Sequence, residues 1–351
     1  MALFDNTITT LFQKATGKLN IILPDLIQNM GEEDEIHEYM PLETDLDHYE
    51  VRWVQYDNMG GLAQASVLGG QPTVVKRLAN TTFGVTPTVF REYIEIGEEE
   101  VTKLRRLDEI EAFQEIEQIV AQGTMQLQVR ERNVVLYNLW QMLTTGTQNV
   151  YSPNGTLAGV NKYDINLTNA STAWTNYTTA TPIKDLRAMF ATIFGTSSHF
   201  GPDTYGKANI ISINQLFNNA NNNDLAGLRD KYGASVTISL EAVNAMFVGS
   251  GLPKIQEYQS SWQNDDANQT KARFLPDNYI VFFGKRPNNQ PVGHYKFVRN
   301  MVQGMNSGSY FFTRTPDQMP DPIPPRWQLH RGHNGGVTVE YPSAIRVFYT
   351  L

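Results

Sequence analysis

The segment from Gly201 to Lys207, Gly-Pro-Asp-Thr-Tyr-Gly-Lys, has the glycine and lysine spacing of a phosphate-binding loop. Such a loop follows a strand, precedes a helix, and carries a Ser or Thr after the lysine to bind magnesium. Here Ala208 follows the lysine, and the apolar stretch 208–213 is predicted to be a buried strand. The sequence therefore gives no support to a nucleotide site at this loop.

Two histidines, His330 and His333, are three residues apart and flank Gly332. The next three residues, Asn334-Gly335-Gly336, predict a turn. No thiol or obvious third ligand is nearby, so a solvated pair is favoured over a metal site. The remaining histidines are scattered along the chain at His37, His48, His199 and His294.

Carboxylates are abundant, but no acid–base pair can be recognised among them. They form a run at Glu98, Glu99 and Glu100 and recur at Glu109, Glu111, Glu115 and Glu117. The second group spreads around a face predicted to be solvated, whereas a general acid or base needs a partly buried member in a pocket. No nucleophile elbow of the Gly-x-Ser-x-Gly type is recognised. We therefore predict no catalytic, cofactor-binding or metal-binding residues, and favour a structural protein over an enzyme.

Composition narrows the possible partners and compartment. The 351 residues carry a net charge of -8 and no basic cluster, so any contact with DNA should be loose. There are no cysteines, which excludes disulfides and thiolate metal sites. The first residues lack the pattern of a signal peptide, and no apolar run is long enough to span a membrane. We expect synthesis in the cytoplasm.

The chain is organised around one predicted helix from about Glu109 to Thr144. Its apolar residues recur at helical spacing, at Phe113, Ile116, Val120, Leu127 and Val134. The other faces are assigned to polar residues, at Glu111, Glu115, Gln118, Gln122, Gln126, Arg130 and Glu131. Gly123 is the one weak position, and Gly146 predicts the C-terminal stop. Such a helix would be about 50 Å long, which is as long as a whole domain.

The segments before this helix are predicted to be extended. Residues 1–48 are interpreted as an amphipathic and then acidic arm. A two-stranded excursion is predicted from Val51 through residues 89–96, with Gly60-Gly61 and Gly69-Gly70 as candidate bends. An isolated ribbon of this length is only marginally stable in water, so we expect it to lie on another subunit; a mobile surface loop is the alternative.

After the long helix, a compact α+β unit is predicted at about 182–296. Thr181 and Pro182 predict a helix start, with threonine as N-cap and proline at the first helical position. A short helix is predicted at 222–232, and strands at 208–213, 234–240 and 245–251. The stretch 274–284 is predicted to be a turn that leads into a strongly apolar strand. More strands are predicted in the tail at 308–314, 326–331, 337–340 and 344–349, with prolines at 316, 320, 322, 324 and 325 forming a stiff link between the first two.

This order of elements resembles the major capsid protein of tailed bacteriophages, with the HK97 fold, and especially the lambda-type branch. The resemblance rests on Val51 to Leu107 leading into the long helix, on Phe274-Leu-Pro-Asp-Asn-Tyr-Ile-Val-Phe-Phe-Gly284, and on the tail Tyr341-Pro-Ser-Ala-Ile-Arg-Val-Phe-Tyr349. It implies an α+β fold with an N-terminal arm (1–48), an extended β loop (49–95), a peripheral domain (96–181) with a spine helix at about 109–144, an axial domain (182–296), return strands of the peripheral domain (297–340) and a C-terminal strand with the axial domain (341–351).

The function implied by the resemblance is self-assembly into hexamers and pentamers of an icosahedral shell that encloses packaged double-stranded DNA, in a virion assembled in the host cytoplasm. The implied partners are other copies of the chain, a separate scaffolding protein, a portal and a decoration protein, with no membrane and no cofactor. Some relatives cross-link a lysine of the extended loop to an asparagine, but no motif around Lys76 supports this bond. The alternatives are an encapsulin-like compartment shell and, in another class, a hydrolase with an unrecognised site.

Overall fold

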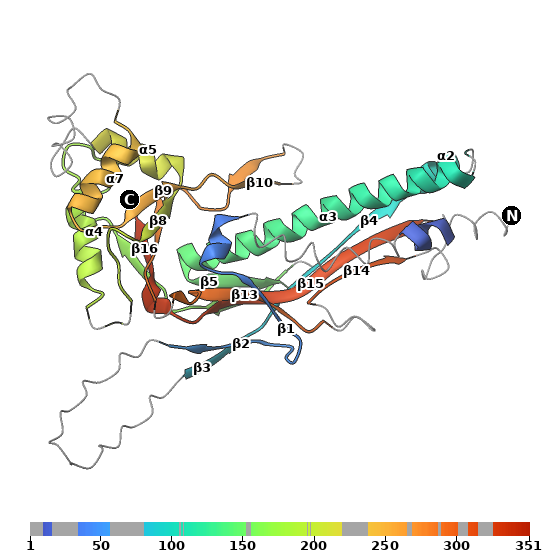
Figure 1. Ribbon diagram of the computed structural model, residues 1–351, viewed down its shortest axis with the longest axis horizontal. Coiled ribbons are helices and arrows are strands. Elements are labelled where there is room, and N and C mark those ends of the chain that lie inside the picture. Colours follow the sequence, from blue (N-terminus) through green and yellow to red (C-terminus); the bar gives the residue numbers. More distant parts are fainter. Residues whose placement is uncertain are drawn as a thin grey trace, which may run out of the picture.

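The structure is a computed structural model whose ribbon is shown in Figure 1. It describes residues 10–15, 34–56, 81–104, 107, 109–151, 156–194, 196, 198–219, 238–264, 269–286, 289–300, 308–314 and 326–351. Several expected features lie outside these ranges: both glycine bends of the excursion, Lys76, the short helix at 222–232, most of the strand at 234–240, and the prolines from 316 to 325.

The long helix α3 packs along a five-stranded sheet (Figure 1). The helix spans Glu109–Thr145, which confirms the predicted length. The sheet comprises β1 (Leu42–Asp45), β4 (Thr88–Ile96), β13 (Gly293–Val298), β14 (Ser309–Arg314) and β15 (Trp327–Val339). Its path runs β1-β13-β15-β14, and β4 pairs antiparallel with β15 along nine positions. The strand β13 crosses the expected boundary at 296.

The buried face of α3 follows the predicted helical spacing. Ile116, Val120 and Leu127 are at most 1% exposed and pack with Trp327 and Leu329 of β15. A Cβ added at Gly123 would lie 2.7 Å from Leu329 Cδ1, so this glycine permits close approach of helix and sheet. Gly146 has φ of 67° and ends the helix as predicted.

A second sheet, of order β7-β16-β12-β8-β9, lies at the other end of the molecule. Its strands are β7 (Asn166–Asn169), β8 (Tyr205–Ala208), β9 (Lys254–Glu257), β12 (Tyr279–Phe283) and β16 (Ile345–Tyr349). It packs with α4 (Pro182–Ala191), α5 (Ile210–Asn219) and α7 (Leu240–Gly249). Trp174, Phe282 and Phe348 are fully buried in the core between them. The last strand of the chain thus joins strands from the middle of the sequence.

Two predicted strands in this region are wrong, because their residues are helical. After β8 ends at Ala208, the helix α5 begins, and Asn209 Oδ1 accepts a hydrogen bond from the Ser212 backbone N–H. Residues 245–249 belong to α7, where the Ser239 side chain accepts from the Ala242 N–H. Short apolar runs do not distinguish a strand from a buried helix, and the polar caps decided both cases. Thr181 precedes α4 as predicted, but its side chain makes no capping hydrogen bond.

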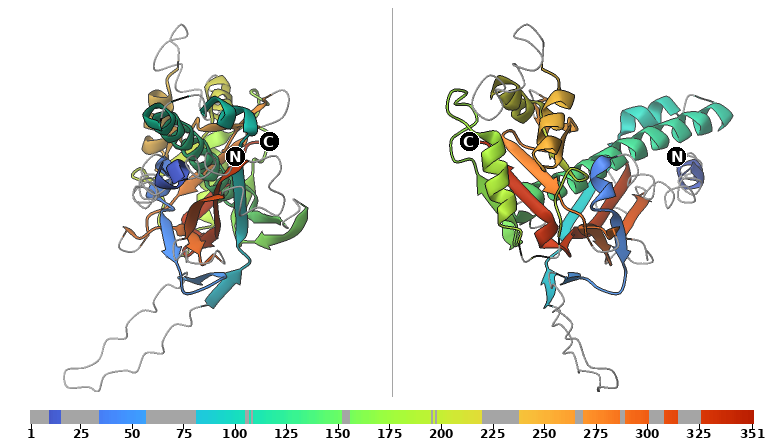
Figure 2. Two further views of the ribbon diagram at one scale, coloured as in Figure 1. Left: turned by 90° about the vertical axis from the view of Figure 1, so that its right-hand side faces the viewer. Right: turned by 60° about the vertical axis from the view of Figure 1, so that its left-hand side comes forward.

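The excursion ends earlier in the sequence than predicted, because its returning strand is residues 81–85 and not 89–96. Strand β2 (Val51–Gln55) pairs antiparallel with β3 (Thr81–Val85), and the pair projects from the sheet on the side away from α3 (Figures 1 and 2). Residues 88–96 were expected in the excursion but form β4 of the five-stranded sheet. Their alternating burial reflects a strand with one face packed on α3.

The remaining elements are short. They are η1 (Glu35–Glu38), α2 (Glu98–Leu104), β5 (Thr147–Tyr151), β6 (Leu157–Lys162), β10 (Ser261–Gln263), β11 (Lys271–Arg273) and η5 (Pro342–Ala344). The helical residues 10–15 of the N-terminal segment pack on the chain itself, where the Phe12 ring stacks on Trp327 with 5.6 Å between centroids.

Candidate assembly surface

The outward face of α3 is uncharged over about three turns. Every exposed residue between positions 116 and 129 is uncharged, and these residues are Gln118, Ala121, Gln122, Met125, Gln126 and Val129. We call this set the uncharged stripe. Met125 is 68% exposed and Val129 is 47% exposed. Because protein interfaces are depleted of charge at their centres and enriched in methionine, the stripe is suited to contact another protein surface.

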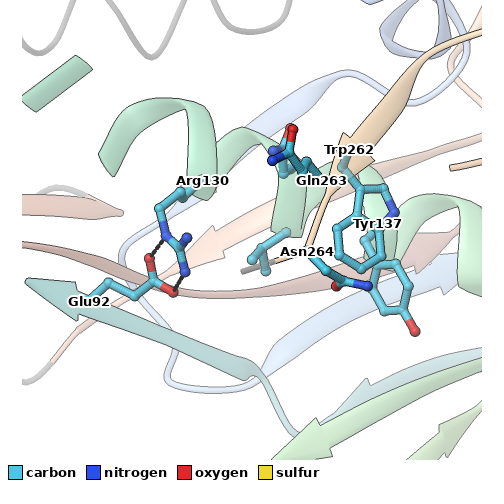
Figure 3. Close-up of a pocket in the computed structure, with 8 residues that line it drawn as sticks. Glu92, Arg130, Tyr137, Trp262, Gln263 and Asn264 are labelled. Carbon is cyan, nitrogen blue, oxygen red and sulfur yellow. Dashed lines mark hydrogen bonds and ion pairs between the residues drawn. The ribbon is translucent and has the colours of Figure 1, made fainter. Parts of the chain in front are cut away.

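A pocket of about 270 Å³ continues this face toward the C-terminal end of the helix (Figure 3). It is lined by residues of α3, β4 and the β10 region: Glu92, Arg130, Asn133, Val134, Tyr137, Trp262, Gln263 and Asn264. Asn133 and Tyr137 follow Val129 at steps of four, so they lie on the same side of the helix as the stripe. The Tyr137 and Trp262 rings meet edge to face, with 5.9 Å between centroids.

Polar groups border the pocket. Arg130 donates from Nη2 to Glu92 Oε1 at 2.7 Å and from Nε to Glu92 Oε2, which joins α3 to β4 by two parallel hydrogen bonds. The Trp262 Nε1–H is buried and has no hydrogen-bond partner within the described part of the chain. A buried donor without a partner is costly, so this tryptophan is held in place at the expense of one hydrogen bond.

On the opposite side of α3, Glu131 is buried in an ionised network. Its Oε1 accepts from Ser309 Oγ at 2.8 Å and lies 2.8 Å from His333 Nδ1, and its Oε2 accepts from Arg331 Nε. His333 Nε2 lies 2.9 Å from the Tyr295 hydroxyl. Burial by itself raises the pKa of Glu131, but the hydrogen bonds and charges of His333 and Arg331 outweigh burial and lower this pKa to about 2.

The predicted turn around His330 and His333 is wrong. Both histidines and Asn334-Gly335-Gly336 lie within β15. His333 is fully buried, whereas His330 stacks on Phe312 with 4.7 Å between ring centroids. A Cβ added at Gly335 would lie 2.7 Å from Tyr295 Cε1. The glycines therefore permit close packing in the sheet, which sequence alone does not distinguish from a turn.

The segment from Gly201 to Lys207 is not arranged as a phosphate-binding loop, but the expected reason was partly wrong. A helix does follow, since α5 begins at Ile210. Lys207 itself lies within β8, is 3% exposed, and donates through Nζ to Glu35 and to Gln256, the latter at 2.7 Å. A lysine held in a strand by these side chains is not directed into a loop that could cradle phosphate.

The other sequence-predicted groups are spread over the molecule. Glu111 and Glu115 are exposed on α3, as predicted, and Glu117 is half-buried. Of the scattered histidines, His37 is buried with Nδ1 3.1 Å from the Met40 carbonyl oxygen, and burial lowers its pKa. The absence of catalytic, cofactor and metal residues stays a prediction. No helix in the described ranges is both long and apolar enough to cross a membrane.

Sequence reasoning missed Glu131, although a signal was present. Glu131 is four residues after Leu127 and four before Val135, and both of these neighbours are 1% exposed. A carboxylate in a row of buried positions on one helix face predicts a buried ionic partner. The pocket at Trp262 had no comparable signal, because it depends on a hairpin distant in sequence from α3.

A family profile described as phage major capsid protein E matches residues 48–295, which is well over half of the chain. The chain belongs to the phage major capsid protein E family. It is therefore a structural protein of the virion capsid whose copies associate into a shell, and neither the compartment shell nor the hydrolase alternative is favoured. No curated protein sequence matches it.

A solved capsid structure with a TM-score above 0.5 supports the HK97-like fold of this major capsid protein. A prophage capsid protein from E. coli CFT073 has a TM-score of 0.55 at 12% identity, and the alignment covers 93% of this chain and 98% of that one. A phage-related protein from Bordetella bronchiseptica RB50 has a TM-score of 0.46 at 10% identity, covering 93% and 96%. The capsid of Myoviridae phage XM1 has a TM-score of 0.43 at 10% identity, covering 87% of each chain.

Proposed function

We propose that this capsid protein assembles into hexamers and pentamers of an icosahedral shell that encloses packaged double-stranded DNA. The observation that carries the proposal is the uncharged stripe of α3 with its adjoining pocket, in a chain that belongs to a capsid family. Solvent-exposed helices normally carry charges, and leaving three turns without any is costly for solubility unless another surface covers them.

The proposed domains keep the expected order, with two boundaries moved. We propose an arm at 1–48, an extended loop at 49–87, a peripheral domain at 88–181 and 293–340, an axial domain at 182–292, and a C-terminal strand that joins the axial domain. The parallel pairing of β16 with β7 and its antiparallel pairing with β12 support the last assignment. Because β13 and β4 both pair with β15, we place them with the peripheral domain.

The overall charge is compatible with a shell around DNA. At a net charge of -8, the surface repels phosphates, so packaged DNA would contact the subunit only loosely. We propose that a separate scaffolding protein and a portal take part in assembly in the host cytoplasm, and that a decoration protein is a further candidate partner. These partners follow from the function of a shell that must be built to a defined size and then filled.

The test is negative-stain electron microscopy of the purified protein, together with its mass by size-exclusion chromatography with light scattering. The protein should be expressed alone and together with the products of its neighbouring genes. Closed shells or uniform rings of five and six subunits are the expected result. A discrete monomer or dimer in both preparations, across salt and protein concentration, would overturn the proposal.

A further inference from the structure

Three potential metal ligands from distant parts of the sequence meet beside the five-stranded sheet. They are Glu43 of β1, His294 of β13 and Glu340, which follows the end of β15. One ligand atom from each residue lies within 4.8 Å of the other two. Imidazole nitrogen with carboxylate oxygen is a donor set that suits divalent first-row transition metals. No sequence pattern indicates this cluster, because the three residues share no motif.

Backbone hydrogen bonds hold each ligand in place. Glu43 lies opposite Lys296 in the parallel pairing of β1 with β13. The His294 N–H donates to Thr338 Oγ1 at 2.9 Å, and the Glu340 N–H donates to the Val292 carbonyl oxygen at 2.9 Å. A site whose ligands come from paired strands is largely formed before a cation binds.

The distances suit a cation after small side-chain movements. His294 Nδ1 lies 2.8 Å from Glu340 Oε1 and 3.8 Å from Glu43 Oε2. A Zn²⁺ ion with bonds of about 2.0–2.2 Å places neighbouring ligand atoms roughly 3.3 Å apart. The His294 and Glu340 side chains are 18% and 17% exposed, and Glu43 is 44% exposed, so water can complete the coordination from the open side.

The ammonium group of Lys296 competes with a cation for the carboxylate of Glu43. Lys296 Nζ lies 2.9 Å from Glu43 Oε2, and its side chain is 13% exposed. This ammonium group neutralises one of the two carboxylates and occupies an oxygen that the cation would use. Binding of a cation must therefore displace Lys296 from Glu43, and this displacement weakens the affinity for the cation. Substitution of Lys296 should for the same reason change the affinity at this site and at no other.

We propose that Glu43, His294 and Glu340 form a binding site for a divalent transition-metal cation, with Zn²⁺ as the representative ion. The bound cation joins β1, the last strand of the N-terminal segment, to β13 and to the end of β15. The carbonyl oxygen of Glu340 also accepts a hydrogen bond from the Tyr56 N–H at 2.8 Å, at the base of the excursion. The site would thus fix the strand β1 and the base of the excursion to the rest of the sheet.

The experiment measures binding of Zn²⁺ and Co²⁺ to the full chain. Zn²⁺ affinity is obtained by competition with a chromophoric chelator, and Co²⁺ ligation by its visible absorption bands. We expect one saturable site in the wild type, an increase in thermal stability with Zn²⁺, and no such increase with the same concentration of Mg²⁺. His294→Ala and Glu340→Gln should each lower the affinity at least tenfold and remove the Co²⁺ bands.

Two further variants separate this site from binding elsewhere. Lys296→Met should raise the Zn²⁺ affinity several-fold, because it frees Glu43. His48→Ala is the matched control, because His48 contacts a single carboxylate, that of Asp45, and it should bind Zn²⁺ as the wild type does. Circular dichroism without metal establishes that each variant is folded. Absence of saturable binding in the wild type, or equal affinity in the wild type, His294→Ala and Lys296→Met, would overturn the proposal.

Discussion

Glu131 of the long helix and Arg331 of β15 form an ion pair in which both side chains are only 1% exposed. The pair connects the middle of α3 to the middle of the five-stranded sheet. The two Nη atoms of Arg331 have no hydrogen-bond partner in the described ranges, so Glu131 is the principal compensation for its buried charge. Such a pair fixes the register of helix on sheet, since sliding either element would leave a buried charge unpaired.

Replacing Glu131 by glutamine should therefore destabilise the subunit. The substitution preserves the shape but leaves the Arg331 charge buried without a partner. We expect the free energy of unfolding to fall by about 3–5 kcal/mol, measured by urea denaturation. Glu115→Gln on the exposed face of the same helix is the control, with a change of less than about 0.5 kcal/mol. Equal effects of the two variants would show that the buried pair contributes no more than a surface charge.

The same pair predicts how stability depends on acid. The folded-state pKa of Glu131 is about 2, which is below its ordinary value of 4.5. A lowered carboxyl pKa contributes stability that is fully present above the unfolded pKa and is lost as pH falls through the folded pKa. The wild type should lose stability between about pH 4.5 and 2, and Glu131→Gln should show a shallower loss in urea titrations over this range. Parallel profiles for the two proteins would contradict this assignment.

Gly332 lies in β15 between the two histidines, His330 and His333. A Cβ at this position would lie 2.5 Å from Tyr310 Oη and would also contact the Phe90 carbonyl oxygen. Because the strand is paired on both sides, neither neighbour can easily move, and Gly332→Ala should cost about 1–3 kcal/mol. Gly159→Ala is the control, since nothing lies within 4 Å of its added Cβ. Thermal unfolding of both variants provides the comparison, and a neutral Gly332→Ala would show that β15 is less tightly packed than the structure indicates.

Secondary structure was predicted correctly where the sequence pattern fits only one kind of element. It was predicted wrongly where the same apolar run fits both a helix and a strand. The predicted length of α3 and the predicted turn and apolar strand within 274–284 are confirmed: the strand is β12, and Asn278 before it has φ of 68°. The strands predicted at 208–213 and 245–251 are wrong, because most of their residues lie in α5 and α7, and runs of four to six apolar residues fit either structure. The side chains of Asn209 and Ser239, which cap these helices, distinguish the two structures.

The candidate surfaces could be predicted only in part for a similar reason. The uncharged stripe is visible in the sequence, once α3 is recognised, as a run of glutamine and apolar residues without charge. The pocket and the cluster around His294 each combine residues more than a hundred positions apart, from Glu92 to Trp262 and from Glu43 to Glu340. Only the pairing of strands brings such residues together, and periodicity carries no information about it.

The excursion permits a test that leaves the subunit intact. Gln55 and Thr81 are cross-strand partners, so a short loop can replace residues 57–80 and still close the hairpin of β2 and β3. Retaining Tyr56 and adding Asp-Gly gives a three-residue loop and keeps the hydrogen bond from Tyr56 to Glu340. We expect a soluble, folded chain with nearly unchanged thermal stability that fails to form stable shells in electron micrographs. Normal particles would show that the excursion is not needed for assembly.

The uncharged stripe makes the sharpest prediction for assembly, because Met125 and Val129 are exposed and contribute little to the core. The double variant Met125→Glu, Val129→Glu should unfold at the same temperature as the wild type. If a neighbouring copy covers the stripe, two carboxylates would be buried there without partners, at a cost of several kcal/mol. Each 1.4 kcal/mol is a factor of ten in affinity, so the concentration needed for assembly should rise at least a hundredfold in light scattering.

The matched control is Met125→Gln, Val129→Gln, which removes the apolar side chains but keeps the stripe uncharged. It should assemble at concentrations between those of the wild type and the glutamate variant, because it loses buried apolar area without burying charge. If the glutamate variant assembles like the wild type, the stripe faces solvent in the shell. If the two variants are equally impaired, contact depends on apolar area alone, and the absence of charge on this face of α3 has another cause.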